Sequence, residues 1–229
     1  MILSMRRLAF LLLLTAALAA PAVASAAERT VSVNATVERQ VPNDAAEVHF
    51  AVSKERPGRA AALRVVALRV KAVIAASQGI AGVGAGDVTT GSISVRRVER
   101  GKKPVYRASE GVAVVTHQPE AAGELVGAGV AAGATSTRGP RFFVGDREAA
   151  YNAALVEALE KAKAKAELLA AAAGATLGPA ITIVEGGGVT FSGPQASEPA
   201  AGKDGAPAPP VKPGKSTVEA TVAATFALE

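Results

Sequence analysis

Hydrophobic and polar residues alternate one by one over several stretches of this chain, which is the period of a β-strand with one buried face. Residues 30–38 alternate in this way, and a second run places Val48, Phe50 and Val52 on one face. Between the two runs lies Pro42-Asn43-Asp44, and these residue types favour turns. We therefore expect the first two strands to form a hairpin.

Helical periodicity follows these strands. From Pro57 onward, hydrophobic residues recur at steps of three and four until Gly79, which is suited to end a helix. A shorter helix is expected from Pro119 to about residue 132, since proline is well placed in a first turn. Glycine disfavours a helix, so this one must depend on packing, and its glycines would let it lie close to a sheet. They are Gly123, Gly127 and Gly129.

The longest predicted element is a helix over residues 146–173, rich in alanine, lysine and glutamate. Asp146 is a suitable N-cap residue, and Gly174 lies just past the end. The spacing of the apolar side chains predicts that one face of this helix packs against the rest of the protein. The residues expected on that face are Leu155, Leu159, Ala162, Ala166 and Leu169.

Further strands complete the predicted sheet, and they cover residues 88–98, 105–116, 135–144, 180–185 and 217–228. The segment 186–214 is rich in proline, alanine and glycine, and we expect it to be a disordered surface loop inserted into the domain. The order ββαββαβαββ predicts an α+β fold, with a mostly antiparallel sheet of about seven strands and helices packed on one face, including the long one.

The start of the chain has the pattern of a secretory signal peptide, which we assign to residues 1–26. Arg6 and Arg7 precede an apolar run that is too short to cross a bilayer, and the segment ends in Ala24-Ser25-Ala26, a cleavage pattern. We therefore expect residues 27–229 to form one domain of a periplasmic or secreted protein. It would be soluble after cleavage, with no transmembrane span.

Composition excludes some kinds of partner and chemistry. The formal net charge is +5, and it falls to +3 once Arg6 and Arg7 are removed. The basic residues are scattered and aromatic residues make up only 3% of the chain, so a nucleic-acid platform of stacked aromatics is not expected. The chain has no cysteine, which excludes a disulfide or a thiolate nucleophile.

The chain resembles the SIMPL-domain family, which includes exported bacterial proteins such as the periplasmic immunogenic ones. The resemblance covers nearly all of the mature chain and rests on the order and spacing of several short motifs, each of them a turn or a packing position. Among these motifs are Val31-Ser-Val-Asn-Ala-Thr-Val37, Val41-Pro-Asn-Asp-Ala-Ala-Glu-Val48, Asp87-Val-Thr-Thr90, Leu177-Gly178-Pro179 and the closing strand from Val218 to Leu228.

The resemblance implies export and no established enzyme activity, and it supplies no catalytic residues. It also implies links to oxidative-stress defence in some members and assembly into large ring-like or channel-like oligomers in others. Here Met1 and Met5 both lie in the predicted signal peptide, so the mature chain has no sulfur with which to scavenge an oxidant. Any protective effect would therefore be indirect.

The few residues that could carry chemistry lie apart in the sequence. His49 alternates with core residues and should face water or a partner subunit, and His117 ends a strand, where a capping role is expected. Asp44 and Asp87 stand where Asx turns would use them. The glycine-rich stretch 82–86 lies between a helix and a strand, the wrong order for a nucleotide loop. We therefore assign no catalytic, metal-binding or cofactor-binding residue and expect no cofactor.

These observations favour a protein that is not an enzyme and that acts in the cell envelope through self-assembly or partner binding, with a possible link to stress defence. The expected partners are other copies of the chain, in a homo-oligomer, or an envelope protein. The alternative is a monomeric module that binds a small ligand or an envelope component. A hydrolase is the third reading, and it would have to use Asp44, Asp87, His49 or His117.

Overall fold

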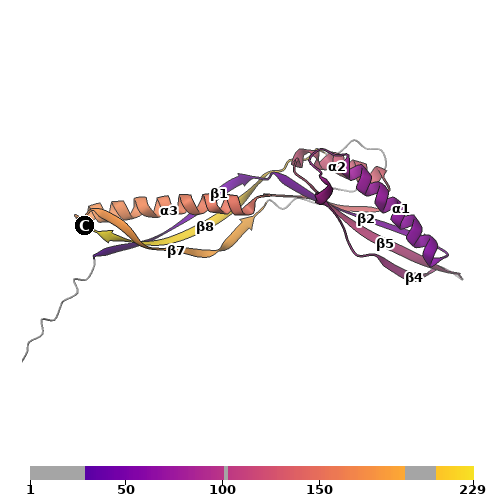
Figure 1. Ribbon diagram of the computed structural model, residues 1–229, viewed down its shortest axis with the longest axis horizontal. Helices are drawn as coiled ribbons and strands as arrows, with labels where there is room; N and C mark the ends of the chain where they lie inside the picture. The colour runs from indigo at the N-terminus through magenta and orange to yellow at the C-terminus, as the bar shows by residue number, and fades with distance from the viewer. Residues whose placement is uncertain (1–28, 101–102, 194–209) are drawn as a thin grey trace, which may run out of the picture.

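The computed structural model describes residues 29–100, 103–193 and 210–229. The predicted signal peptide lies outside these ranges, and so does most of the segment predicted to be a disordered loop. In Figure 1 the described part of the chain forms two lobes that lie end to end. No helix in the described ranges is long and apolar enough to cross a membrane.

The first lobe, which we call the α3 lobe, is formed from the beginning and the end of the described chain. It contains a three-stranded antiparallel sheet in the order β1-β8-β7 and one long helix on a single face of that sheet (Figure 1). Its elements are β1 (Thr30–Pro42), α3 (Arg147–Ala172), β7 (Leu177–Ser192) and β8 (Lys215–Leu228).

The second lobe, which we call the inserted lobe, is built from the chain between β1 and α3. Its five-stranded sheet has the order β3-β5-β2-β6, with β4 also paired to β5, and two helices cover one face. Its strands are β2 (Ala45–Arg56), β3 (Val88–Thr90), β4 (Ser94–Arg100), β5 (Lys103–Thr116) and β6 (Ser136–Phe143). Its helices are α1 (Arg59–Gln78) and α2 (Ala122–Ala131), with short 3-10 turns at Ala85–Asp87 and Pro119–Ala121.

The predicted α+β class is confirmed, with antiparallel strands and helices on one face of each sheet. The predicted hairpin of the first two strands is wrong, because β1 pairs with β8 while β2 pairs with β5 and β6. The strands therefore form two sheets instead of one. Alternation shows which side chains of a strand are buried, but it does not show which strand is the neighbour. The Pro42-Asn43-Asp44 segment carries the chain from one sheet to the other.

Other differences concern the ends of strands. The strand expected over residues 88–98 is divided into β3 and β4, and between them the backbone N–H of Gly91 donates to the carbonyl of Gly111, with 2.8 Å between nitrogen and oxygen. Strand β7 is longer than expected and continues as far as Ser192, so the first residues of the predicted loop 186–214 belong to a strand. There the backbone pairs with β8, as at Gly186 opposite Thr221.

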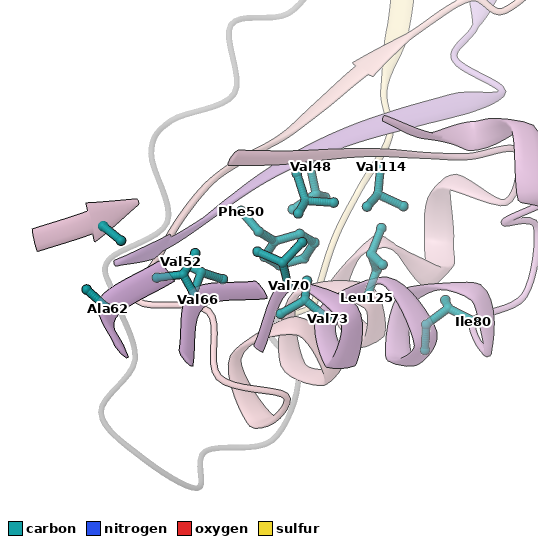
Figure 2. Packing of buried hydrophobic residues seen from close by; sticks show 12 residues of the cluster. Val48, Phe50, Val52, Ala62, Val66, Val70, Val73, Ile80, Val114 and Leu125 are labelled. Carbon is teal, nitrogen blue, oxygen red and sulfur yellow. The ribbon is translucent and has the colours of Figure 1, made fainter. Parts of the chain in front are cut away.

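The core of the inserted lobe lies between its sheet and its two helices (Figure 2). Val48, Phe50 and Val52 point from β2 toward α1 and α2, as the alternating pattern predicts. The predicted close approach of α2 to the sheet is confirmed at Gly129. A Cβ added there would lie only 2.2 Å from Cε1 of Phe50. Because no side chain could fit in that space, the glycine sets the separation of helix and sheet.

The long helix α3 is confirmed, with Asp146 as its N-cap: the carboxylate Oδ1 accepts a hydrogen bond from the N–H of Ala149, at 2.8 Å. The predicted packing face is correct only in part, because Leu169 is 42% exposed. The buried face is instead a stripe of alanines at every fourth position, preceded by Tyr151. Small side chains let the helix lie close to the sheet, which turns larger residues toward the flanks. The stripe consists of Ala154, Ala158, Ala162, Ala166 and Ala170.

Candidate functional site

The chain passes between the two lobes twice, and side chains join these two crossings. The first crossing runs from β1 to β2 through Asn43 and Asp44, and the second runs from β6 to α3 through Gly145. Asp44 Oδ1 accepts a hydrogen bond from the backbone N–H of Gly145, at 2.6 Å. The carboxylate thus bonds to a residue far away in the sequence, and the Asx turn predicted for Asp44 is wrong.

Asn43 anchors the first crossing to the segment before β8. Its side chain is buried, and its Oδ1 accepts a hydrogen bond from the hydroxyl of Ser216, at 2.6 Å. Its Nδ2 donates to the carbonyl of Pro213, at 2.7 Å, and its backbone N–H donates to the carbonyl of Gly214, at 3.2 Å. Because buried polar groups are costly when unpaired, these bonds fix the path of the chain between the lobes.

Asp87 and His117 form a pair beside this junction. The ring Nε2 of His117 lies 3.2 Å from Oδ1 of Asp87, while Oδ2 of Asp87 accepts the N–H of Gly84, at 2.8 Å. The Gly84 N–H, and to a lesser degree His117, hold the pKa of Asp87 below its ordinary value. The Asx turn predicted for Asp87 is wrong, because its carboxylate accepts the N–H of Gly84, three residues before it, and not that of a residue after it. The capping role predicted for His117 is wrong, since its ring contacts a residue from another loop.

Asp44, Asp87 and His117 line one shallow depression together with Asp146, and its volume is about 670 Å³. Sequence reasoning did not bring them together, because the turns that carry them converge only in the folded chain. Each carboxylate accepts a hydrogen bond from a backbone N–H, and no serine lines the depression. The described residues contain no group of three or more His, Asp or Glu that could hold a metal ion. The three carboxylates hold the turns and the second crossing in place.

His49 lies away from this depression, on the open face of the inserted sheet. As predicted, it points away from the core, and its side chain is 51% exposed. Its Nε2 is 3.4 Å from Oε1 of Glu47, and Oε2 of the same carboxylate lies 2.6 Å from Nη2 of Arg141. The hydrogen bond from Arg141, with a smaller contribution from His49, lowers the pKa of Glu47.

A second depression, of about 650 Å³, lies beside His49 on this open face. Its floor includes Ala51 and Gly111, and Ser136 and Arg138 of β6 border it. Sequence reasoning missed these residues, because only the register of β2 against β5 and β6 shows that they are neighbours. The alternating signal of β2 identifies the face of Ala51, but it does not identify what lies beside it.

The outer edge of β7 is the third exposed feature. Among the described residues β7 pairs only with β8, so its other edge has no partner strand. Ile181, Ile183 and Val184 are 47%, 54% and 57% exposed. Ile183 stands opposite Ala224 on the α3 side of the sheet, and Val184 stands opposite Ala223 on the other side. The edge therefore carries apolar side chains on both faces.

Comparison with known families finds a match over most of the chain. Residues 31–226 match the model of the SIMPL family, which is described as a protein of unknown function (DUF541). The chain belongs to the SIMPL family. The match begins in β1 and ends in β8, so this SIMPL domain includes both lobes and both crossings. No protein in the curated set matches the sequence.

Proposed function

We propose that this SIMPL-domain protein is exported, has no enzymatic activity and acts in the cell envelope by assembling with other copies of itself. The free apolar edge of β7 carries this proposal. Strand edges in stable monomers are usually shortened, charged or covered, since their free N–H and C=O groups otherwise pair with another chain. Edge β7 has 16 residues, and its exposed isoleucines and valine would add apolar burial to backbone pairing.

The small core of the α3 lobe also favours assembly. One three-stranded sheet and one helix form this lobe, and the helix face that packs on the sheet consists largely of alanines. Alanine buries little apolar area, so a second copy against β7 would add burial that the lobe lacks on its own. A role in stress defence would then be indirect and would depend on the assembled form.

Light scattering coupled to gel filtration, applied to residues 27–229, tests the proposal. We expect a defined oligomer for the natural sequence and the mass of a single chain for the double variant Ile183→Lys/Val184→Lys, because lysines on a strand edge oppose pairing. The matched control is Val156→Lys, which adds a charge at an exposed apolar residue of α3 and should leave the oligomer intact. A natural chain that stays monomeric at high concentration would contradict assembly.

A specific observation also supports the alternative, a monomeric module that binds a ligand or envelope component. The inserted sheet has a depression on its open face, and that depression is remote in the sequence from β7. If the protein is monomeric, ligand screening should begin at this face. An envelope protein could also bind the β7 edge in place of a second copy. Crosslinking in cells, with the same lysine double variant as the control, separates these two partners.

A further inference from the structure

The open face of the inserted sheet combines small side chains with arginines. Helices α1 and α2 both pack on the other face, against Val48, Phe50 and Val52. Residues that alternate with these three point to the open face. From β2 they include His49, Ala51 and Ser53, and their partners on β5 are Ala113, Gly111 and Ser109.

The middle of this face is a floor without large side chains. Ala51 stands between Gly111 of β5 and Ser136 of β6, and all three line the depression of about 650 Å³. A Cβ added at Gly111 would have Phe50 O as its nearest neighbour, at 3.8 Å, which is an ordinary contact. A side chain there would therefore fit the fold and stand in the depression. Because residue 111 is a glycine and has no side chain, the floor stays open.

Arginines lie at both ends of this floor. On β6, Arg138 stands opposite His49 and Arg141 opposite Glu47. At the other end, Arg96 of β4 stands opposite Arg107 of β5. His49 and Glu55 mark the two ends on β2, and the six residue steps from one to the other span roughly 20 Å. Positive groups at this separation match a ligand that is extended and carries repeated negative charges.

Acidic residues neutralise only part of this charge. Glu47 pairs with Arg141, and Glu55 pairs with both Arg100 and Arg107. Within the described ranges, Arg96 and Arg138 have no acidic partner. These two cations lie at opposite ends of the floor, so each is available to a ligand that crosses it.

We infer that this face, with Arg138 and Arg96 at its ends and Gly111 on its floor, binds a chain of acidic polysaccharide. The floor offers serine hydroxyls and room for bulky rings, and the arginines suit carboxylate or sulfate groups. Phe143 lies at one end of the face, with Arg141 over its ring at 5.2 Å. Phe50 also lines the depression, but its side chain is buried in the core on the other face, so the floor has no aromatic platform of the kind on which nucleic-acid bases stack. This site does not include β7, so a result that contradicts assembly through β7 would not contradict polysaccharide binding, and the reverse also holds.

Binding to heparin and to polygalacturonate, measured with residues 27–229 at low ionic strength, tests this inference. We expect Arg138→Ala and Arg96→Ala each to weaken binding about three- to tenfold, and the double variant to weaken it further. The control is Arg64→Ala, which removes the same charge from an exposed position on α1, the other side of the same lobe. It should change the affinity by less than about twofold.

A second pair of variants tests the floor without changing any charge. Gly111→Leu should abolish most binding, while Gly127→Leu, at an exposed position of α2 with nothing near its Cβ, should leave it unchanged. Circular dichroism and thermal unfolding confirm that each variant is folded. Equal weakening by Arg64→Ala and Arg138→Ala, or full binding by folded Gly111→Leu, would overturn the inference. Equally tight binding of duplex DNA with the same response to the variants would overturn the assignment to polysaccharide.

Discussion

Asp44 and Gly145 are 101 residues apart in the sequence, yet the Asp44 carboxylate accepts a hydrogen bond from the Gly145 N–H at 2.6 Å. This bond joins the two chain crossings between the α3 lobe and the inserted lobe. Next to it, Asn43 is held by Ser216 and by the carbonyl of Pro213. The inserted lobe is therefore connected to the α3 lobe by a hydrogen-bonded junction.

The bond between Asp44 and Gly145 should contribute measurably to stability. Asp44→Ala removes the acceptor, and we expect it to lower the free energy of unfolding by about 1–2 kcal/mol in urea. Asp44→Asn keeps an oxygen acceptor at the same position and should lower the free energy of unfolding by less than Asp44→Ala does. Equal stability of the alanine variant and the natural protein would show that the bond does not hold the crossings together.

The close contact of Gly129 with Phe50 gives a second prediction. Gly129→Ala places a Cβ about 2.2 Å from the ring, so α2 must move, and we expect a loss of roughly 1–3 kcal/mol. Gly127→Ala, two residues earlier on the exposed side of α2, should instead stabilise the protein by about 0.5–1 kcal/mol, because alanine favours a helix. The double variant Gly129→Ala/Phe50→Leu should recover part of the loss. Thermal and urea unfolding measure the stability of all three variants.

The alanine stripe of α3 gives a third prediction. Ala162 is fully buried between α3 and the sheet, so Ala162→Leu must push the helix outward, at a cost of about 1–3 kcal/mol. Leu168 is 69% exposed, so Leu168→Ala, a change of the same two residue types in reverse, should alter stability by less than about 0.5 kcal/mol. Comparable losses in the two variants would contradict the observed helix orientation.

The ion pair of Glu47 and Arg141 predicts a dependence of stability on pH. Arg141 holds the pKa of Glu47 below its ordinary value of 4.5. A carboxyl with a lowered pKa in the folded state stabilises the protein fully above its unfolded pKa. That stabilisation is lost as the pH falls through the folded pKa. Thermal melting at a series of pH values from about 6 to 3 should show this loss, and Glu47→Gln should reduce it.

The control for this measurement is Glu160→Gln, at an exposed position of α3 with no ion pair among the described residues. Its melting temperature should follow that of the natural protein as the pH falls. If Glu47→Gln behaves in the same way as this control, the ion pair with Arg141 does not contribute to acid sensitivity.

Most of the helices and strands could be predicted from the sequence. The N-cap at Asp146, the end of α1 near Gly79 and the buried side of β8 all agree with the structure. The face of α3 could be predicted only in part. The spacing of apolar residues correctly placed Ala162 and Ala166 on the packing face, but it also placed Leu169 there, which is 42% exposed. It missed the buried Ala154, Ala158 and Ala170. Helix propensity and spacing do not show how close the facing sheet will come.

The candidate surfaces were less accessible to sequence reasoning. Asp87 and His117 are 30 residues apart, and nothing in the sequence indicates that they are in contact. The floor of Ala51, Gly111 and Ser136 depends on two strand registers, one of which shifts between Glu47 and His49. A shift of one residue would turn a different set of side chains to the open face.

By itself the sequence determined the positions of helices and strands, the side chains that face a core and the membership of the SIMPL family. These properties follow from neighbours a few residues apart, since the backbone geometry of a helix or strand fixes where each side chain points. Only the tertiary structure decided that β1 pairs with β8, that the strands form two sheets and that Asp44 meets Gly145. These contacts join distant residues, and they depend on packing and register summed over the whole chain.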